Sequence, residues 1–305
     1  MGKIAFIYPG QGAQKSFMGQ DFYNRYPACA AMFDKVEEVL DISVKDLCFR
    51  ENPLLDQTQY TQPAMVTTCL GITAVLKDMG IVPDMTAGLS LGEYAAIAAA
   101  GGMDYTDAIR LVRQRGIYME EAVPSGKGAM SAVLGMEAEA IEKVLEDFDD
   151  VFIANYNCPG QIVITGMKEG VEAASAALTE AGAKRCIPLV VSGPFHSVYL
   201  KEAGTKLREY MKDIAFRELR IPYITNVTAT YVSDKDEITP LLEKQVSSSV
   251  RWQQSVETML ADGVDTFIEI GPGKTLAGFI KKIDREAKVI NVSCVEDLEQ
   301  IKDLF

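Results

Sequence analysis

The segment Met85-Thr86-Ala87-Gly88-Leu89-Ser90-Leu91-Gly92-Glu93-Tyr94 decides how the sequence is interpreted. Met85–Gly88 predicts a short β-strand, and Gly92–Ala100 predicts a helix. Between them stands G-x-S-x-G, whose small residues permit a sharp turn that exposes the serine hydroxyl. The N–H groups at the start of the helix would lie where an oxyanion forms. The segment therefore predicts a nucleophilic Ser90; the alternative is an incidental serine in a glycine-rich turn.

Outward from this segment, short apolar runs alternate with amphipathic stretches. Ile4–Tyr8 and Thr266–Ile270 are strand candidates, and each is followed by a loop of glycine and proline. Strands that alternate with helices are typical of an α/β fold with a largely parallel sheet. The sequence therefore predicts an α/β domain built around Met85–Gly88 and these two strands.

The middle of the chain has a different order of elements. Strands are expected over Ala129–Leu134, Val151–Tyr156, Ile162–Thr165 and Lys184–Leu189, and helices over Glu137–Phe148 and Lys168–Ala181. The order βαββαβ is the ferredoxin-like pattern. We therefore expect residues 125–192 to form a small inserted domain, and residues 1–124 and 193–305 to form the larger α/β domain together.

Composition narrows the classes of function. The chain has 305 residues, of which 48% are hydrophobic, and a net charge of −13. An acidic chain disfavours binding to nucleic acid, which needs a basic surface. No apolar stretch approaches the ~18 residues of a membrane-spanning helix. With scattered cysteines and one histidine, a metal site is not expected; the cysteines are interpreted as reduced thiols of a cytoplasmic protein.

Two glycine motifs do not predict a nucleotide site. Gly10-Gln11-Gly12-Ala13-Gln14-Lys15 fails the dinucleotide pattern because Lys15 stands at its last position. Gly271-Pro272-Gly273-Lys274-Thr275 ends like a phosphate-binding loop, but Ile268 occupies the position of the required first glycine. The sequence therefore gives no support for NAD or ATP as a cofactor.

A serine nucleophile needs a base, and His196 is the one histidine in the chain. If a serine–histidine mechanism operates, His196 must be that base. It follows a predicted strand in the loop Ser192–Ser197, where catalytic groups are often held. Taken alone, a structural histidine on the surface or in the core is the simpler interpretation.

Arg115 is the third informative residue. Within the expected helix Asp104–Ala122, the 100° spacing places it on the apolar face with Val112 and Met119. A buried guanidinium without an anionic partner is costly, so Arg115 should meet an anion. The partner is either a structural carboxylate or the carboxylate of a substrate, and the sequence leaves both open.

These motifs together resemble the malonyl-CoA:acyl carrier protein transacylases of fatty-acid synthesis and the acyltransferase domains of polyketide synthases. The resemblance covers most of the chain. Its markers, in chain order, are Phe6–Gly12, Gln62–Ala64, Gly88–Tyr94, Arg113–Gly116, Asn155–Gln161, Gly193–Ser197 and Glu269–Gly273. Leu89 departs from the family, which often has histidine there. The resemblance implies a hydrolase-like α/β domain with a ferredoxin-like insertion.

The resemblance also implies residue roles. Ser90 would be the nucleophile, His196 its base and later its acid, and Arg115 the group that binds the malonyl carboxylate. The backbone N–H groups of Gln11 and Leu91 would form the oxyanion hole. Gln245 matches the position whose carbonyl orients the histidine. The remaining positions implied to line the cleft are Gln62, Asn155, Asn157 and Phe195, the last resembling malonyl-selective members.

The implied reaction is a ping-pong transfer of malonyl from malonyl-CoA, through a Ser90 ester, to the phosphopantetheine thiol of acyl carrier protein. No cofactor, metal or membrane is implied, and the chain is expected to act as a monomer. A basic surface for the acidic carrier is expected at Lys274, Lys281, Lys282 and Arg285, with Lys184 and Arg185. The alternatives are a serine hydrolase of acyl thioesters, a polyketide acyltransferase with another extender unit, and a catalytically silent docking protein.

Overall fold

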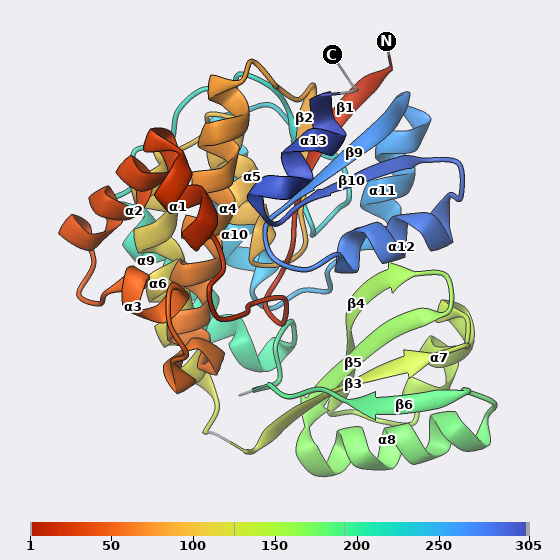
Figure 1. Cartoon of the computed structure of the whole chain (residues 1–305). Helices are drawn as coiled ribbons and strands as arrows, with labels where there is room; N and C mark the ends of the chain where they lie inside the picture. The colour runs from red at the N-terminus through yellow and green to blue at the C-terminus, as the bar shows by residue number, and fades with distance from the viewer. Residues whose placement is uncertain (1, 125, 192, 303–305) are drawn as a thin grey trace.

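The computed structural model describes residues 2–124, 126–191 and 193–302 (Figure 1). Its main sheet has six strands in the order β10-β9-β1-β2-β7-β8. These are β1 Lys3–Tyr8, β2 Met85–Gly88, β7 Tyr223–Ile224, β8 Tyr231–Val232, β9 Val264–Ile270 and β10 Lys288–Val292. All neighbours pair in parallel except β7 and β8. The expected largely parallel sheet is therefore confirmed.

Helices cover both faces of this sheet because side chains alternate along each strand. On β1, Phe6 and Tyr8 join the core that contains α4 and α5, whereas Ala5 and Ile7 join the core that contains α11 and α12. The bounds of these helices are α4 Thr58–Asp78, α5 Gly92–Ala99, α11 Trp252–Ala261 and α12 Thr275–Ile283. The sheet is thus the middle layer of three.

The other helices mostly enlarge the layer on the α4 side (Figure 1). They are α1 Gln20–Arg25, α2 Pro27–Val39, α3 Val44–Cys48, α6 Tyr105–Ala122, α9 Lys201–Met211, α10 Ile238–Gln245 and α13 Glu299–Lys302. Short 3-10 turns lie at Pro53–Asp56, Val198–Leu200, Lys235–Glu237 and Val295–Leu298. None of the described helices is long and apolar enough to cross a bilayer.

A second, antiparallel sheet has the strand order β4-β5-β3-β6. Its strands are β3 Gly128–Leu134, β4 Val151–Cys158, β5 Gln161–Met167 and β6 Arg185–Pro188, with helices α7 Ala138–Leu145 and α8 Lys168–Glu180. This is the expected βαββαβ insertion, and the fold class is confirmed. Two of the expected boundary residues, Ser125 and Ser192, lie outside the described residues.

The second sheet turns one face to its own helices and the other to the main domain. On β3, Val133 packs with Ile141 of α7 and Leu178 of α8. Met130 and Ala132 point to the opposite face, where they line a cleft. The alternation along this strand therefore makes the insertion one wall of that cleft.

Candidate active site

Ser90 stands on a sharp turn between β2 and α5, as the sequence predicts. Its φ of 51° lies in the left-handed region, which is costly for serine. A Cβ at Gly88 would lie 2.0 Å from the backbone carbon of Gly92, and a Cβ at Gly92 would lie 2.1 Å from the Tyr8 carbonyl oxygen. Strand and helix therefore approach so closely at this turn that both positions require glycine.

Two side chains from distant segments hold the backbone of Ser90. The Ser90 N–H donates to Asn226 Oδ1 at 2.7 Å, and the Asn226 amide donates in turn to the Gly88 carbonyl at 2.7 Å. The Ser90 carbonyl accepts from Gln245 Nε2 at 2.7 Å. Both backbone polar groups of the strained residue are thus satisfied by side chains.

His196 lies in the loop after β6, and its Nε2 is 2.7 Å from Ser90 Oγ. On the other side of the ring, Nδ1 contacts the carbonyl oxygens of Gln245 at 3.0 Å and Ser248 at 3.1 Å. Because carbonyl oxygens only accept, Nδ1 carries the proton and Nε2 accepts from the serine hydroxyl. Gln245 ends α10, where helix carbonyls lack intrahelical partners. The Gln245 carbonyl at the end of helix α10 therefore orients the histidine, a role that an acidic side chain usually has in serine–histidine sites.

Burial and the nearby Arg115 cation lower the pKa of His196 to about 4. The ring is 4% exposed, so its charged form loses most of its hydration. At neutral pH the imidazole is uncharged and can accept the proton of Ser90, as a general base must.

Arg115 projects from α6 beneath the turn and is 1% exposed. Its Nη2 donates to Ser90 Oγ at 3.2 Å and to Gln245 Oε1 at 3.2 Å, and its guanidinium carbon lies 5.2 Å from the centre of the Tyr94 ring. Within the described residues no carboxylate comes within 4.0 Å of this guanidinium, and its Nε has no hydrogen-bond partner. The prediction that Arg115 lies on the buried face of α6 is confirmed. Of the two partners that the sequence left open, a structural carboxylate is not found among the described residues.

A cleft of about 640 Å³ opens between the two sheets at Ser90. Gln11, Asn155, Asn157 and Phe195 line it together with Ser90 and His196. Gln62 and Arg115 are not among its lining residues. Gln62 is buried in α4, where its Nε2 lies 3.5 Å from Met119 Sδ, whereas Arg115 lies directly behind Ser90 and contacts its Oγ. The structure thus brings most of the expected cleft residues together, whereas the Gln62 side chain is buried and does not reach the cleft.

Of the two N–H groups expected to form an oxyanion hole, that of Leu91 lies in the turn directly after Ser90, and that of Gln11 lies in the loop after β1, which lines the cleft. Among the described residues, neither the Gln11 nor the Leu91 backbone N–H donates a hydrogen bond, so both can receive a ligand oxygen. The Gln11 side chain is fixed separately, because its Nε2 donates to Thr58 Oγ1 at 3.0 Å. Leu91 precedes α5, so its N–H belongs to the positive end of that helix.

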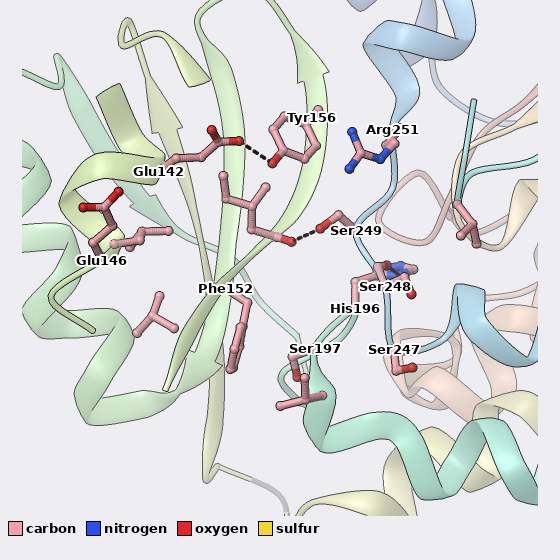
Figure 2. Close-up of a pocket in the computed structure, with 15 residues that line it drawn as sticks. Glu142, Glu146, Phe152, Tyr156, His196, Ser197, Ser247, Ser248, Ser249 and Arg251 are labelled. Carbon is pink, nitrogen blue, oxygen red and sulfur yellow. Dashed lines mark hydrogen bonds between the residues drawn. The ribbon is translucent and has the colours of Figure 1, made fainter. Parts of the chain in front are cut away.

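His196 also lines a second cavity, of about 610 Å³, on the side of the segment Ser247–Arg251 (Figure 2). Figure 2 shows His196 next to Ser248, with Ser249 bonded across the cavity to the insertion. On the insertion side, the Tyr156 hydroxyl donates to Glu142 at 2.7 Å. The histidine and the carbonyls that hold it therefore lie where the insertion contacts the main domain.

Sequence reasoning missed Glu93, Asn226 and Ser248. Asn226 and Ser248 act through contacts with residues more than 50 positions away, and no local motif marks them. Glu93 carries a detectable signal, since it is a carboxylate within the otherwise apolar helix Gly92–Ala99. Burial raises the pKa of Glu93 to about 7, against hydrogen bonds from Gln245, Thr225 and Asn226 that lower it.

Comparison with known proteins agrees with this geometry. Residues 5–298 match the acyl transferase domain family. The chain is 47% identical over 304 residues to the malonyl CoA-acyl carrier protein transacylase of Bacillus subtilis, covering 98% of this chain and 96% of that protein. The crystal structure of malonyl CoA-acyl carrier protein transacylase from Clostridium perfringens is 39% identical, with a TM-score of 0.95 over 99% of this chain and 96% of that one.

A second similar structure is that of a malonyl-transacylase in complex with its type II PKS acyl-carrier protein. It is 35% identical, with a TM-score of 0.96, and the match covers 99% of this chain and 100% of that chain. The matches span both sheets, and they extend along nearly the whole chain. The chain therefore belongs to the acyl transferase domain family, whose match includes the Ser90 turn, His196 and Arg115.

Proposed function

We propose that this protein transfers a malonyl group from malonyl-CoA to the phosphopantetheine thiol of acyl carrier protein through an ester on Ser90. The observation that carries the proposal is the contact of Ser90 Oγ with both His196 Nε2, at 2.7 Å, and Arg115 Nη2, at 3.2 Å. His196 can activate the hydroxyl as a base. Arg115, which has no ion pair within the described structure, lies beside that hydroxyl and can bind the carboxylate of a substrate.

In the first half-reaction, His196 Nε2 takes the Ser90 proton as Oγ attacks the thioester carbonyl carbon. The N–H groups of Gln11 and Leu91 stabilise the resulting oxyanion. The carbon–sulfur bond then breaks, CoA leaves with the proton from His196, and malonate remains esterified to Ser90. The carbonyls of Gln245 and Ser248 stabilise the imidazolium during this step.

In the second half-reaction, His196 takes the proton of the phosphopantetheine thiol, and the sulfur attacks the Ser90 ester. Collapse returns the proton to Ser90 Oγ and releases malonyl carrier protein. Arg115 holds the malonyl carboxylate through both steps. Side chains and backbone N–H groups carry each proton and charge, so the proposal assigns no cofactor to the chain.

Most of the expected basic residues lie in or beside α12, a helix that lines the cleft. Leu276 and Phe279 of α12 line the cleft, while Lys274, Lys281 and Lys282 are exposed. Val190, which also lines the cleft, is 103% exposed. We therefore place the acidic carrier protein over this part of the cleft, with the basic residues around it and Val190 beneath it. The named relatives and the carrier-protein complex among them support acyl carrier protein as the partner.

Three further expectations belong to the same proposal. The division into residues 1–124 with 193–305 and residues 125–192 is supported by the two separate sheets. A cytoplasmic location is supported by six cysteines in the free form. The reaction as written needs one chain and one carrier protein, so we propose a monomer.

Intact-mass spectrometry after mixing with malonyl-CoA tests the proposal. The expected result is a malonyl adduct on the natural protein, none on Ser90→Ala, and release of the adduct as malonyl carrier protein. Arg115→Ala should lose malonyl transfer in preference to acetyl transfer. Absence of an adduct would favour a silent docking protein, and hydrolysis faster than transfer would favour a thioesterase.

A further inference from the structure

Three buried side chains form a row beneath Ser90, and the middle one is an amide. Gln245 Oε1 accepts from Arg115 Nη2 at 3.2 Å, and Gln245 Nε2 donates to Glu93 Oε2 at 2.9 Å. Arg115 is 1% exposed, and both Gln245 and Glu93 are 0% exposed. The row therefore runs from a cation, through a carboxamide, to a carboxylate.

The amide keeps two opposite charges apart where a direct ion pair would be expected. Buried charges usually pair because an isolated charge is costly in the interior. Here Glu93 contributes to the field at Arg115, yet no carboxylate of the described residues lies within 4.0 Å of the guanidinium. The charge of Glu93 thus stabilises the Arg115 cation from a distance, while N–H groups of the guanidinium remain available to bind the carboxylate of a substrate.

The carboxylate of Glu93 also decides which way the amide points. In the observed sense, the amide nitrogen faces two oxygens, Glu93 Oε2 and the Ser90 carbonyl, and the amide oxygen faces Arg115. A reversed amide would place oxygen against oxygen at Glu93 and NH₂ against the guanidinium. In its ionised form Glu93 only accepts, and its Oε2 already accepts from Gln245 Nε2 and the Asn226 N–H, so it excludes that reversal. A neutral amide at position 93 would permit it.

We propose that Glu93 is a positioning residue, which fixes the Gln245 carboxamide so that Arg115 is held beside Ser90 without being neutralised. In this way Glu93 sets the preference for an acyl group that carries a carboxylate. The inference rests on the proposed malonyl transfer and extends it to a residue that does not touch the substrate.

Glu93 also supports the turn itself, and the test must separate the two roles. Its Oε2 accepts from the Asn226 N–H at 3.2 Å, and Asn226 Oδ1 holds the Ser90 N–H. A purely structural loss at the turn would slow the transfer of every acyl group alike. A loss of Arg115 positioning would act on malonyl more than on acetyl, because acetyl has no carboxylate.

The experiment measures kcat and KM for malonyl-CoA and acetyl-CoA with two variants. Glu93→Gln removes the charge that Glu93 carries above its pKa of about 7 and frees the amide, so the assays are run above that pH. The exchange Glu93→Gln with Gln245→Glu keeps the total charge and moves the carboxylate directly against Arg115. In both, the malonyl-to-acetyl ratio of kcat/KM should fall about tenfold or more, mainly through a raised KM for malonyl-CoA, as for a lost hydrogen bond to a charged group.

Glu269→Gln is the matched control, since Glu269 is also 0% exposed but accepts from the N–H groups that begin α12. It should lower stability and leave the malonyl-to-acetyl ratio unchanged. Equal losses for malonyl and acetyl in the exchange variant, with native circular dichroism, would overturn the role of Glu93. If the natural protein itself showed no preference for malonyl, the proposed function would fail instead.

Discussion

Ser90 and His196 are both held in the left-handed backbone region, with φ of 51° and 59°. Residues other than glycine adopt this region at a cost, and the surrounding contacts must over-determine it. Here the contacts are Asn226 and Gln245 on Ser90, and two carbonyls on the His196 ring. The hydroxyl and imidazole therefore meet at 2.7 Å before any substrate arrives.

Removing the base should abolish most of the first half-reaction. We expect His196→Ala to slow malonyl-adduct formation by about 10²- to 10⁴-fold, the usual contribution of a general base. Rapid-quench mass spectrometry measures this rate directly. Because the chain has no second histidine, a near-natural rate in this variant would contradict the assigned mechanism.

The pH dependence follows from the lowered pKa of His196. Folding depresses it from 6.5 to about 4, so the neutral ring contributes stability above pH 6.5 that is lost as the pH falls through 4. The single imidazole can be titrated by NMR, and we expect a midpoint near 4. Arg115→Gln should raise that midpoint, because the Arg115 cation is the second cause of the shift. A natural midpoint at or above 6.5 would contradict this account.

At this scale the sequence predicts the residues that carry motifs and misses those that act by contact. Ser90 follows from its turn motif and His196 from being the sole histidine. Arg115 follows from a charge on an apolar helix face. The partners of the Ser90 backbone could not be predicted, because Asn226 meets Ser90 across 136 positions of sequence. Gln62 shows the converse, since a matching motif did not place its side chain in the cleft.

Among the elements, the contact of β1, β2 and α5 at the turn constrains the site most. Gly92→Ala would place a methyl group 2.1 Å from the Tyr8 carbonyl oxygen, and backbone cannot move aside as a side chain can. We expect it to lower the free energy of unfolding by about 3 kcal/mol, as overpacking does, and to displace Ser90. Urea denaturation and the rate of adduct formation measure the two effects.

Gly278→Ala is the matched control for this prediction. Gly278 lies within helix α12, and a Cβ there would meet no atom within 4 Å. Alanine favours helix over glycine, so this variant should keep or raise stability by about 0.5–1 kcal/mol. Similar losses in both variants would show that close packing at the turn is not what position 92 requires.

The elements that the sequence predicts best carry either a long amphipathic pattern or a motif that marks their end, as the G-x-S-x-G turn marks the end of Met85–Gly88. Met85–Gly88 is predicted with the observed bounds, and Lys168–Ala181 with a difference of one residue at its end. The two-residue strands β7 and β8 carry no periodicity and owe their pairing to the sheet beside them. The strand β10 also escapes prediction, because lysine and asparagine interrupt its apolar residues at the sheet edge.

For the whole molecule, the segment Ser247–Arg251 joins the insertion to the main domain. Ser249 Oγ donates to the Ile153 carbonyl of β4 at 2.6 Å, and Val250 exchanges backbone hydrogen bonds with β4 at 2.7 and 2.9 Å. The same segment supplies the Ser248 carbonyl that holds His196. The insertion and His196 are therefore both hydrogen-bonded to the same segment, Ser247–Arg251.

Cutting one of these links should loosen the insertion. We expect Ser249→Ala to lower the free energy of unfolding by about 1 kcal/mol, the usual value of a hydrogen bond, and to speed amide exchange in β4. Ser247→Ala is the control, because its hydroxyl makes an exposed contact at 3.4 Å and should matter little. Unchanged exchange in β4 for Ser249→Ala would argue against the link.

The insertion also leaves the main domain close to where it enters, since a Cβ at Gly128 would lie 2.5 Å from the Pro194 nitrogen. Because the two ends of the insertion lie side by side, the insertion can be lengthened, shortened or exchanged without changing the strand order of the six-stranded sheet. Such a graft would still have to reproduce the edge of β4 that meets Val250. Chimeras between relatives should therefore succeed or fail according to that short edge, and not according to the overall likeness of the exchanged pieces.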